Sequence, residues 1–216
     1  MNYTQLTFSN HEFTKERKTI SKIVLDSKNF YKYRNTEDSD SESTINFIKD
    51  NLKAGLFYDY VISREGVIFK VTSEGYASNA LDFNLYSEKA SKFFPTECPQ
   101  TDGAVIKHTT TPDVKCVTIL TETDNVDGTL DTGDMTSETK DALEYLMAYL
   151  FKTESLKPSD VMNRFDFSQK ENDSLGHMLY KNDFVKLVIL TNTAKKIAEE
   201  RSSLTLDLSS TESITL

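Results

Sequence analysis

The chain has 216 residues, a length that suits one well-buried domain with at most a short appendage at an end. Hydrophobic residues make up 38% of the chain and charged residues 27%, which is typical of a globular protein, and no apolar run approaches the roughly 20 residues that cross a bilayer. The formal net charge of −9 argues against nucleic acid as a partner. The first residues show no basic segment followed by an apolar core, so we expect no secretion signal and no membrane partner.

The N-terminal third predicts an arm, a strand and a helix. Residues 1–18 are polar with scattered aromatics, which indicates an arm or an edge strand, and the apolar run 20–25 predicts an interior strand. The acidic segment 35–43 cannot pack into a core, so we expect a loop. Ser43 is expected to cap a helix that Gly55 ends. The apolar face of this helix consists of Ile45, Ile48 and Leu52.

A hairpin follows, and after it comes a segment with weaker patterns. Residues 57–63 and 67–71 are rich in aromatic and β-branched side chains, and the glycine in the turn 64–66 fits a positive φ. Residues 73–115 mix Gly, Pro, Asn and Thr with short apolar pieces. We therefore expect a long irregular excursion there, with a small helix near 86–94.

The second half predicts two more strands, three helices and a strand-like tail. Residues 114–121 indicate a strand, and an acidic loop separates them from a helix over 137–153 that Thr136 caps. The stripe on this helix, which we expect to face the core, consists of Leu143, Leu146, Met147, Leu150 and Phe151. A short helix is expected over 159–162, with Pro158 in its first turn. The run 184–190 predicts a strand and 193–201 a helix.

Mixed strands and helices predict an α/β fold with a mixed central sheet flanked by helices. The last segment, 202–216, alternates apolar and polar residues through Leu204, Leu206 and Leu208, which indicates a strand with one apolar face. Such a strand either adds to a neighbouring subunit or covers an edge of its own domain, and the sequence leaves both open.

Three smaller features give no strong indication of a functional site. Cys98 and Cys116 show no metal-type spacing, so we expect buried thiols, although the two could pair. The basic stretch 15–18, with Lys22, is expected to be a solvated strand entrance and less readily a ligand contact. The histidines, His11, His108 and His177, are too far apart to form a metal-binding pair.

One segment carries a resemblance to a known family. Residues 55–68 read Gly-Leu-Phe-Tyr-Asp-Tyr-Val-Ile-Ser-Arg-Glu-Gly-Val-Ile. This resembles the strand, charged turn and return strand of the zinc-dependent N-acetylmuramoyl-L-alanine amidases, a family that includes peptidoglycan-recognition proteins. Residues 23–25, 75–80 and 116–120 resemble further family elements in the right order. The resemblance spans about 20–190 and implies an amidase-like domain over 19–201, between the arm 1–18 and the tail.

The resemblance also implies where a metal site would lie. In the family the first zinc ligand is a histidine at the end of the first core strand, and the matching residue is Asp26. Arg164 and Asn172 match the other two ligand positions. A guanidinium has no lone pair for a cation and an amide is a poor zinc ligand, so we expect no metal and no other cofactor. We expect Arg164 to face Asp26 across the former metal position.

Three further positions match residues around the family's site. Tyr58 matches a tyrosine of the active site, but packing is the simpler role for it. Ala77 lies where a family loop has histidine, and Lys170 matches a basic residue near the catalytic water. Without a metal-bound hydroxide, neither Tyr58 nor Lys170 has an activating partner. The resemblance therefore predicts a degenerate site and a chain that is not an enzyme.

Three functions follow from these expectations. The first is a structural protein that contacts other subunits of an assembly, such as the tail or baseplate of a phage virion, with a cytoplasmic location before assembly. The second is a module that binds peptidoglycan without hydrolysis, through a groove lined by Tyr58, Tyr76, Asn79 and Asn163. The third is an active amidase with a rearranged metal site, and metal analysis would identify it.

Overall fold

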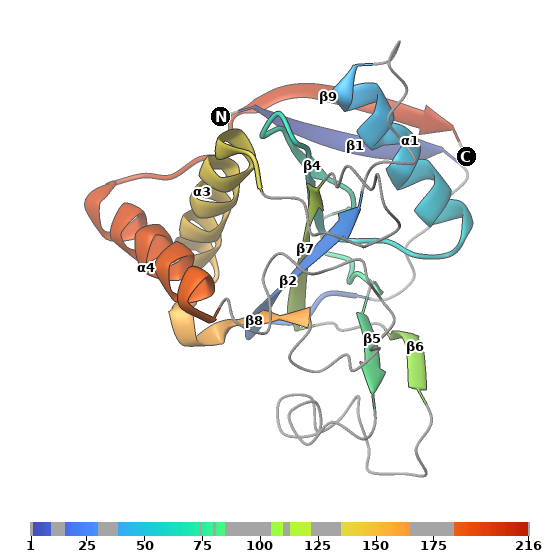
Figure 1. Ribbon diagram of the computed structural model, residues 1–216. Coiled ribbons are helices and arrows are strands. Elements are labelled where there is room, and N and C mark those ends of the chain that lie inside the picture. Colours follow the sequence, from blue (N-terminus) through green and yellow to red (C-terminus); the bar gives the residue numbers. More distant parts are fainter. Residues whose placement is uncertain are drawn as a thin grey trace, which may run out of the picture.

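The computed structural model describes residues 2–9, 16–29, 39–73, 75–79, 81–84, 105–109, 113–121, 135–164 and 184–215 (Figure 1). Within these residues, seven strands form one mixed sheet in the order β8-β2-β7-β3-β4-β1-β9. The strands are β1 Tyr3–Ser9, β2 Lys22–Asn29, β3 Tyr60–Ile62, β4 Ile68–Lys70, β7 Val114–Thr121, β8 Val161–Asn163 and β9 Leu208–Thr215. The β3–β4 pair is antiparallel, and the other neighbours in this sheet are parallel.

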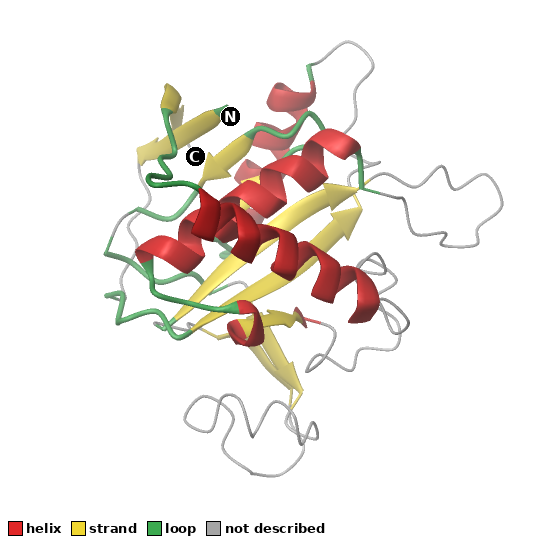
Figure 2. Ribbon diagram, turned by 90° about the vertical axis from the view of Figure 1, so that its left-hand side faces the viewer, coloured by secondary structure: helices red, strands yellow, loops and turns green. Residues whose placement is uncertain are grey.

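Helices cover both faces of the sheet, which confirms the predicted fold class. Helix α1, Asp40–Lys53, lies on one face, and helices α3, Ser137–Thr153, and α4, Phe184–Glu200, lie on the other (Figures 1 and 2). Each layer has its own core. Val24, Phe47 and Val61 belong to the core under α1, whereas Leu25, Ile62 and Leu146 belong to the core under α3 and α4.

Helix α1 begins four residues before the predicted position. Its N-cap is Ser39, whose hydroxyl accepts a hydrogen bond from the Glu42 amide, while the Glu42 carboxylate accepts one from the Ser39 amide. Because this capping box forms, the helix begins after Ser39 and not after Ser43, where the cap was predicted. Ser43 lies instead inside the helix and is 1% exposed. The helix ends before Gly55, as predicted, where φ is +76°.

The predicted hairpin is present and is locked onto helix α3. Strands β3 and β4 flank a turn in which Gly66 has φ +75°. The Thr139 hydroxyl donates to the Ser63 carbonyl at 2.9 Å, and the Thr136 hydroxyl donates to the Arg64 carbonyl at 2.6 Å. A Cβ at Gly66 would lie 2.6 Å from the carbonyl oxygen of Glu138. The turn and the start of α3 therefore need a glycine here.

The elements after α3 differ in part from the prediction. Thr136 caps α3 as expected. Pro158–Asp160 forms a single 3-10 turn, η2, and the chain then enters strand β8, where a helix over 159–162 was predicted. Backbone pairing between β8 and β2 outweighs the helix start that Pro158 favours.

Helix α4 replaces the strand predicted over 184–190 and the shorter helix predicted over 193–201. Its apolar residues recur at helical spacing on the side that packs against α3. Those that lie in or against this core are Leu187, Leu190, Ala194, Ile197 and Ala198. The run of β-branched residues at its start suggested a strand because short apolar runs fit both states. No helix in the described part of the chain is long and apolar enough to cross a membrane.

Both ends of the described chain belong to the central sheet. Strand β1, expected as an arm or an edge strand, lies between β4 and β9, and Leu6 is 1% exposed. Strand β9 pairs with β1 of the same chain. Strands β5, Leu81–Asn84, and β6, Val105–Thr109, form a separate antiparallel pair. The small helix predicted near 86–94 lies outside the described residues.

Candidate functional site

Asp26 and Arg164 form a buried ion pair at the end of strand β8. Asp26 lies in the second half of β2, and Arg164 directly follows β8, which pairs with β2. Arg164 Nη1 donates to Asp26 Oδ2 at 2.7 Å, and the two side chains are 9% and 5% exposed. The contact that the sequence predicted between these two residues is therefore present in the structure.

Two further groups hold the Asp26 carboxylate. Lys28 Nζ lies 3.4 Å from Asp26 Oδ2, and the Ser27 amide donates to Asp26 Oδ1 at 2.9 Å. Burial by itself would raise the pKa of Asp26, but the charges and hydrogen bonds of Arg164 and Lys28 outweigh it and lower the pKa. The carboxylate is thus ionised at neutral pH beside two cationic side chains.

A polar side chain without a partner lies next to this pair. Thr118 on β7 is the register partner of Asp26 across the parallel β2–β7 ladder, and it is fully buried. Its Oγ1 has no hydrogen-bond partner in the structure. Buried hydroxyl groups normally find one, because leaving the group unsatisfied costs free energy. The Ser43 hydroxyl on α1 is the other such atom among the described residues.

The described side chains do not fit the zinc ion that the resemblance implies. A tetrahedral site needs three protein ligands with lone pairs. Asp26 offers one, whereas Arg164 is a permanent cation without a lone pair. Within the described residues, no group of three His, Cys, Asp or Glu side chains is placed to hold a metal. Asn172 and Lys170 lie outside the described residues.

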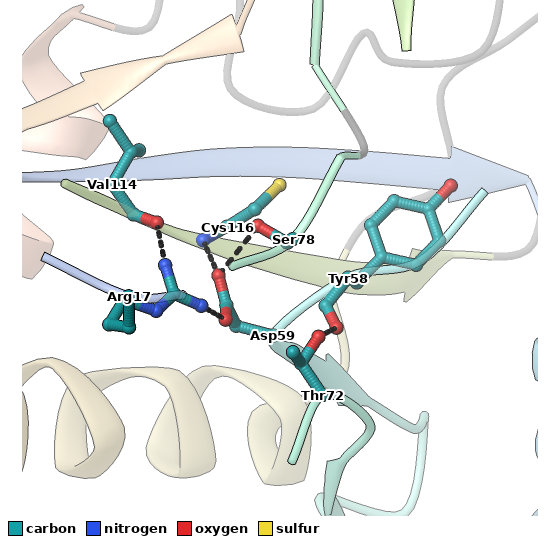
Figure 3. Close-up of polar contacts among 7 residues, drawn as sticks. All are labelled: Arg17, Tyr58, Asp59, Thr72, Ser78, Val114 and Cys116. Carbon is teal, nitrogen blue, oxygen red and sulfur yellow. Dashed lines mark hydrogen bonds and ion pairs between the residues drawn. The ribbon is translucent and has the colours of Figure 1, made fainter. Parts of the chain in front are cut away.

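Tyr58 and Ala77 are buried and do not line a surface. Tyr58 is 1% exposed and stacks on Phe47 of α1, with ring centroids 6.2 Å apart and planes at 18°. Its carbonyl accepts a hydrogen bond from the Thr72 hydroxyl (Figure 3). Ala77 is 1% exposed. Tyr58 therefore packs in the core, as the simpler interpretation predicted, and the groove contact suggested for it is wrong.

A second polar cluster, not anticipated from the sequence, surrounds Asp59 just before β3 (Figure 3). The Asp59 carboxylate pairs with the Arg17 guanidinium and accepts hydrogen bonds from the Ser78 hydroxyl at 2.8 Å and the Cys116 amide at 2.7 Å. Arg17 Nη1 also donates to the Val114 carbonyl at 2.6 Å. Arg17, expected in a solvated strand entrance, is instead mostly buried. The basic stretch that contains Arg17 was the available sequence signal for this cluster, but it did not indicate that Asp59 is the partner of Arg17.

The Asp59 cluster fixes the loop that carries Tyr76. Ser78 joins this loop to Asp59, and the Arg17 amide donates to the Gly75 carbonyl. Asn79 donates to the Gly55 carbonyl at 2.8 Å and thereby holds the other end of the loop. Tyr76 remains 38% exposed on this anchored segment. An exposed aromatic ring on a fixed backbone is well suited to contact a ligand.

The remaining predicted positions have local roles. Cys116 is a buried free thiol, and burial raises its pKa well above the ordinary value. Leu204 is 8% exposed, Leu206 packs against the core under α3 and α4, and Leu208 is 57% exposed. The tail was expected either to add to a neighbouring subunit or to cover an edge of its own domain. The pairing of β9 with β1 of the same chain shows the second of these roles.

Solved structures share this fold at low sequence identity. The hydrolase AmiA from Staphylococcus aureus, solved in complex with its ligand, matches with a TM-score of 0.52 and 13% identity over 94% of this chain and 87% of that chain. The PlyG catalytic domain matches with a TM-score of 0.52 and 10% identity over 95% and 100%. The endolysin N-acetylmuramoyl-L-alanine amidase LysCS from Clostridium intestinale URNW matches with a TM-score of 0.49 and 12% identity over 87% and 95%.

The AmiA and PlyG matches show a shared fold, and they confirm the amidase-like class of fold that the resemblance predicted. No protein-family model matches the sequence, and no curated protein sequence matches it. The expectation that the chain is not an enzyme is contradicted by the two matches with a TM-score of 0.52, since one is named a hydrolase and the other a catalytic domain. The replacement of metal ligands at single positions was too narrow a basis for that expectation.

Proposed function

We propose that this chain binds peptidoglycan, through the face of the sheet that carries Asp26 and Arg164 and through the Tyr76 loop. The observation that carries the proposal is the fold shared with AmiA. The match covers 94% of this chain, and AmiA was solved in complex with its ligand. The N-acetylmuramoyl-L-alanine amidases, whose fold this is, act on peptidoglycan.

Two local features support the proposal. The Asp26–Arg164 pair lies in the second half of β2 and directly after β8, at two positions that the resemblance matches to ligands of the family's metal site. The Tyr76 ring is exposed on a loop that Asp59, through Ser78, and Asn79 hold in place. An anchored aromatic ring loses little conformational freedom when a sugar or peptide packs against it.

Co-sedimentation with purified peptidoglycan sacculi tests the proposal. We expect the chain to be depleted from the supernatant, and Tyr76→Ala to be depleted less, because it removes exposed aromatic area. Ile189→Ser is the matched control. Ile189 is 54% exposed on α4, which covers the opposite face of the sheet, so this change should leave sedimentation unaltered (Figure 2). Full recovery of the unmodified chain in the supernatant would contradict the proposal.

Release of peptidoglycan fragments is measured in the same samples. This readout separates binding from cleavage, because a hydrolytic chain releases soluble material while a binding module does not. Arg164→Met in parallel shows whether any release depends on the ion pair. The zinc content of the purified chain is measured as well. Metal-dependent release of fragments would require a metal site formed by residues other than the described side chains.

A role in an assembly is the second candidate, and the exposed sheet edge favours it. Strand β9 lies at the end of the sheet order, and Leu208 at its start is 57% exposed. Edge strands present backbone groups that a neighbouring chain can pair with. The predicted location in a phage virion belongs to this candidate. Sedimentation analysis should show self-association or capture of a partner subunit that Leu208→Ser weakens; a monomer that binds no subunit would exclude it.

A further inference from the structure

The Asp59 carboxylate lies where three segments of the chain meet (Figure 3). Its backbone is held on both sides, because the Asp59 amide donates to the Cys116 carbonyl at 3.1 Å and the Asp59 carbonyl accepts from the Val71 amide at 3.0 Å. The side chain is 3% exposed. Oδ2 accepts from the Cys116 amide and the Ser78 hydroxyl, and Oδ1 pairs with Arg17. A buried carboxylate with charge-assisted contacts on both oxygens is a rigid anchor.

The loop that carries Tyr76 is held to this anchor from two sides. On one side Ser78, which is fully buried two residues after the tyrosine, donates directly to Asp59 at 2.8 Å. On the other side Arg17 brings a separate segment against the loop. The Arg17 amide donates to the Gly75 carbonyl, and the residue before Arg17 pairs with Tyr76 in an antiparallel bridge. The two arms of this clamp therefore start from the same carboxylate.

We propose that Asp59 is a positioning residue for the contact between Tyr76 and peptidoglycan. The carboxylate is buried, so it acts on the ligand only through the two arms that hold the Tyr76 loop. Loss of an arm lets the loop sample more conformations, and ordering it again on binding then costs free energy. The inference rests on the proposed binding of peptidoglycan, and it identifies the buried group on which the affinity of the exposed ring depends.

Co-sedimentation at increasing amounts of purified sacculi gives an apparent affinity for each variant. Ser78→Ala removes one arm and keeps the pair between Arg17 and Asp59. We expect it to lower the affinity about threefold or more. In a Tyr76→Ala background the same change should have no effect, because the ring that the clamp positions is absent. Equal losses in the two backgrounds would overturn the inference.

Asp59→Asn weakens both arms, because it removes the charge that pairs with Arg17 and leaves only one oxygen as acceptor. The affinity should fall further than in Ser78→Ala, which alone decides the question if Asp59→Asn does not fold. Amide hydrogen exchange follows the loop itself. The amides of Arg17 and Tyr76 donate to carbonyls of the loop, so both should exchange faster in Ser78→Ala. Unchanged exchange at both amides would contradict the clamp.

Thr139→Val is the matched control. Thr139 is as fully buried as Ser78, and its hydroxyl donates to the Ser63 carbonyl at 2.9 Å. It lies on α3, and its partners are in the turn after β3 and at the start of that helix. The variant should lose stability much as Ser78→Ala does, with the affinity for sacculi unchanged. An equal loss of affinity in the control would mean general destabilisation and would overturn the positioning role.

Failure of this inference is distinguishable from failure of the proposed function. An unmodified chain that stays in the supernatant contradicts the function, and the inference falls with it. A chain that sediments with sacculi, but whose affinity is the same with and without the Ser78 hydroxyl, retains the function and loses only the positioning role of Asp59. Sedimentation that does not depend on Tyr76 has the same consequence, because the clamp then positions no contact.

Discussion

Asp26 and Arg164 are 138 residues apart in the sequence, yet Arg164 Nη1 lies 2.7 Å from Asp26 Oδ2 in the folded chain, and this contact is buried. The parallel pairing of β8 with β2 brings them together, because Leu25 is the register partner of Asn163 and each charged residue follows directly. The pair thus depends on the register of the sheet. Any change that shifts β8 along β2 also separates the two charges.

Loss of the Arg164 charge should destabilise the fold strongly. Arg164→Met leaves the Asp26 carboxylate buried, with Lys28 as its nearest described cation, and breaking such a pair costs about 3 kcal/mol or more. Urea unfolding measures the change. The double variant Asp26→Leu with Arg164→Met removes both charges and should recover most of the loss. A double variant as unstable as the single would show that the charges are not coupled.

The free energy of unfolding should change with pH in a way that reflects the protonation of Asp26. Its pKa in the folded state is lowered below the ordinary value of 3.8, so the unfolded chain binds this proton more readily. The stabilisation is therefore fully present well above pH 3.8 and disappears as the pH falls through the lower folded pKa. In Asp26→Asn this component should be absent. Unfolding free energies that show the same acid dependence in both proteins would refute the assignment.

Thr118→Val should stabilise the free protein by about 1 kcal/mol, because an unsatisfied buried hydroxyl is replaced by an apolar group of the same shape. Thr72→Val should have the opposite effect, a loss of about 1 kcal/mol, because it breaks the hydrogen bond to the Tyr58 carbonyl. Chemical unfolding without ligand measures both variants. The opposite signs make the pair informative, and a destabilised Thr118→Val would mean that the hydroxyl has a partner in the free protein.

Gly66→Ala should be more harmful than Gly55→Ala. Both residues have positive φ, which costs an alanine about 1 kcal/mol. The added Cβ at Gly66 would also meet the Glu138 backbone at 2.6 Å, whereas nothing lies within 4 Å of one at Gly55. We expect a further 1 to 3 kcal/mol of destabilisation at Gly66, roughly the cost of overpacking. Thermal and urea unfolding of the two variants give the comparison, and equal losses would contradict the contact.

The parts of the fold that local pattern determines were predictable from the sequence. The stripe on α3, its Thr136 cap, and the β3–β4 hairpin with Gly66 all have strong short-range signals. Helix α4 was missed because its apolar first half reads equally well as a strand, and packing against α3 decides between the two. The inner position of β1 was also missed, since the partner β9 lies more than 200 residues away.

The site was predictable only through the resemblance. That resemblance brought Asp26 and Arg164 together, and their contact followed from opposite charge. The Asp59 cluster could not be found in this way, because Arg17, Asp59 and Ser78 come from three separate segments with no shared motif. Nor could the sequence reveal the unsatisfied Thr118 hydroxyl, which depends on side-chain placement in the folded state.

Mapping the contact surface of a soluble peptidoglycan fragment on the labelled chain tests the central claim most directly. A muropeptide released from sacculi is titrated while backbone amide signals are followed. The account predicts saturable shifts at Asp26, Thr118, Arg164 and Tyr76, with α4 unaffected. No shifts at saturating fragment, or shifts confined to α4 and the β9 edge, would contradict the claim that this face of the sheet binds peptidoglycan.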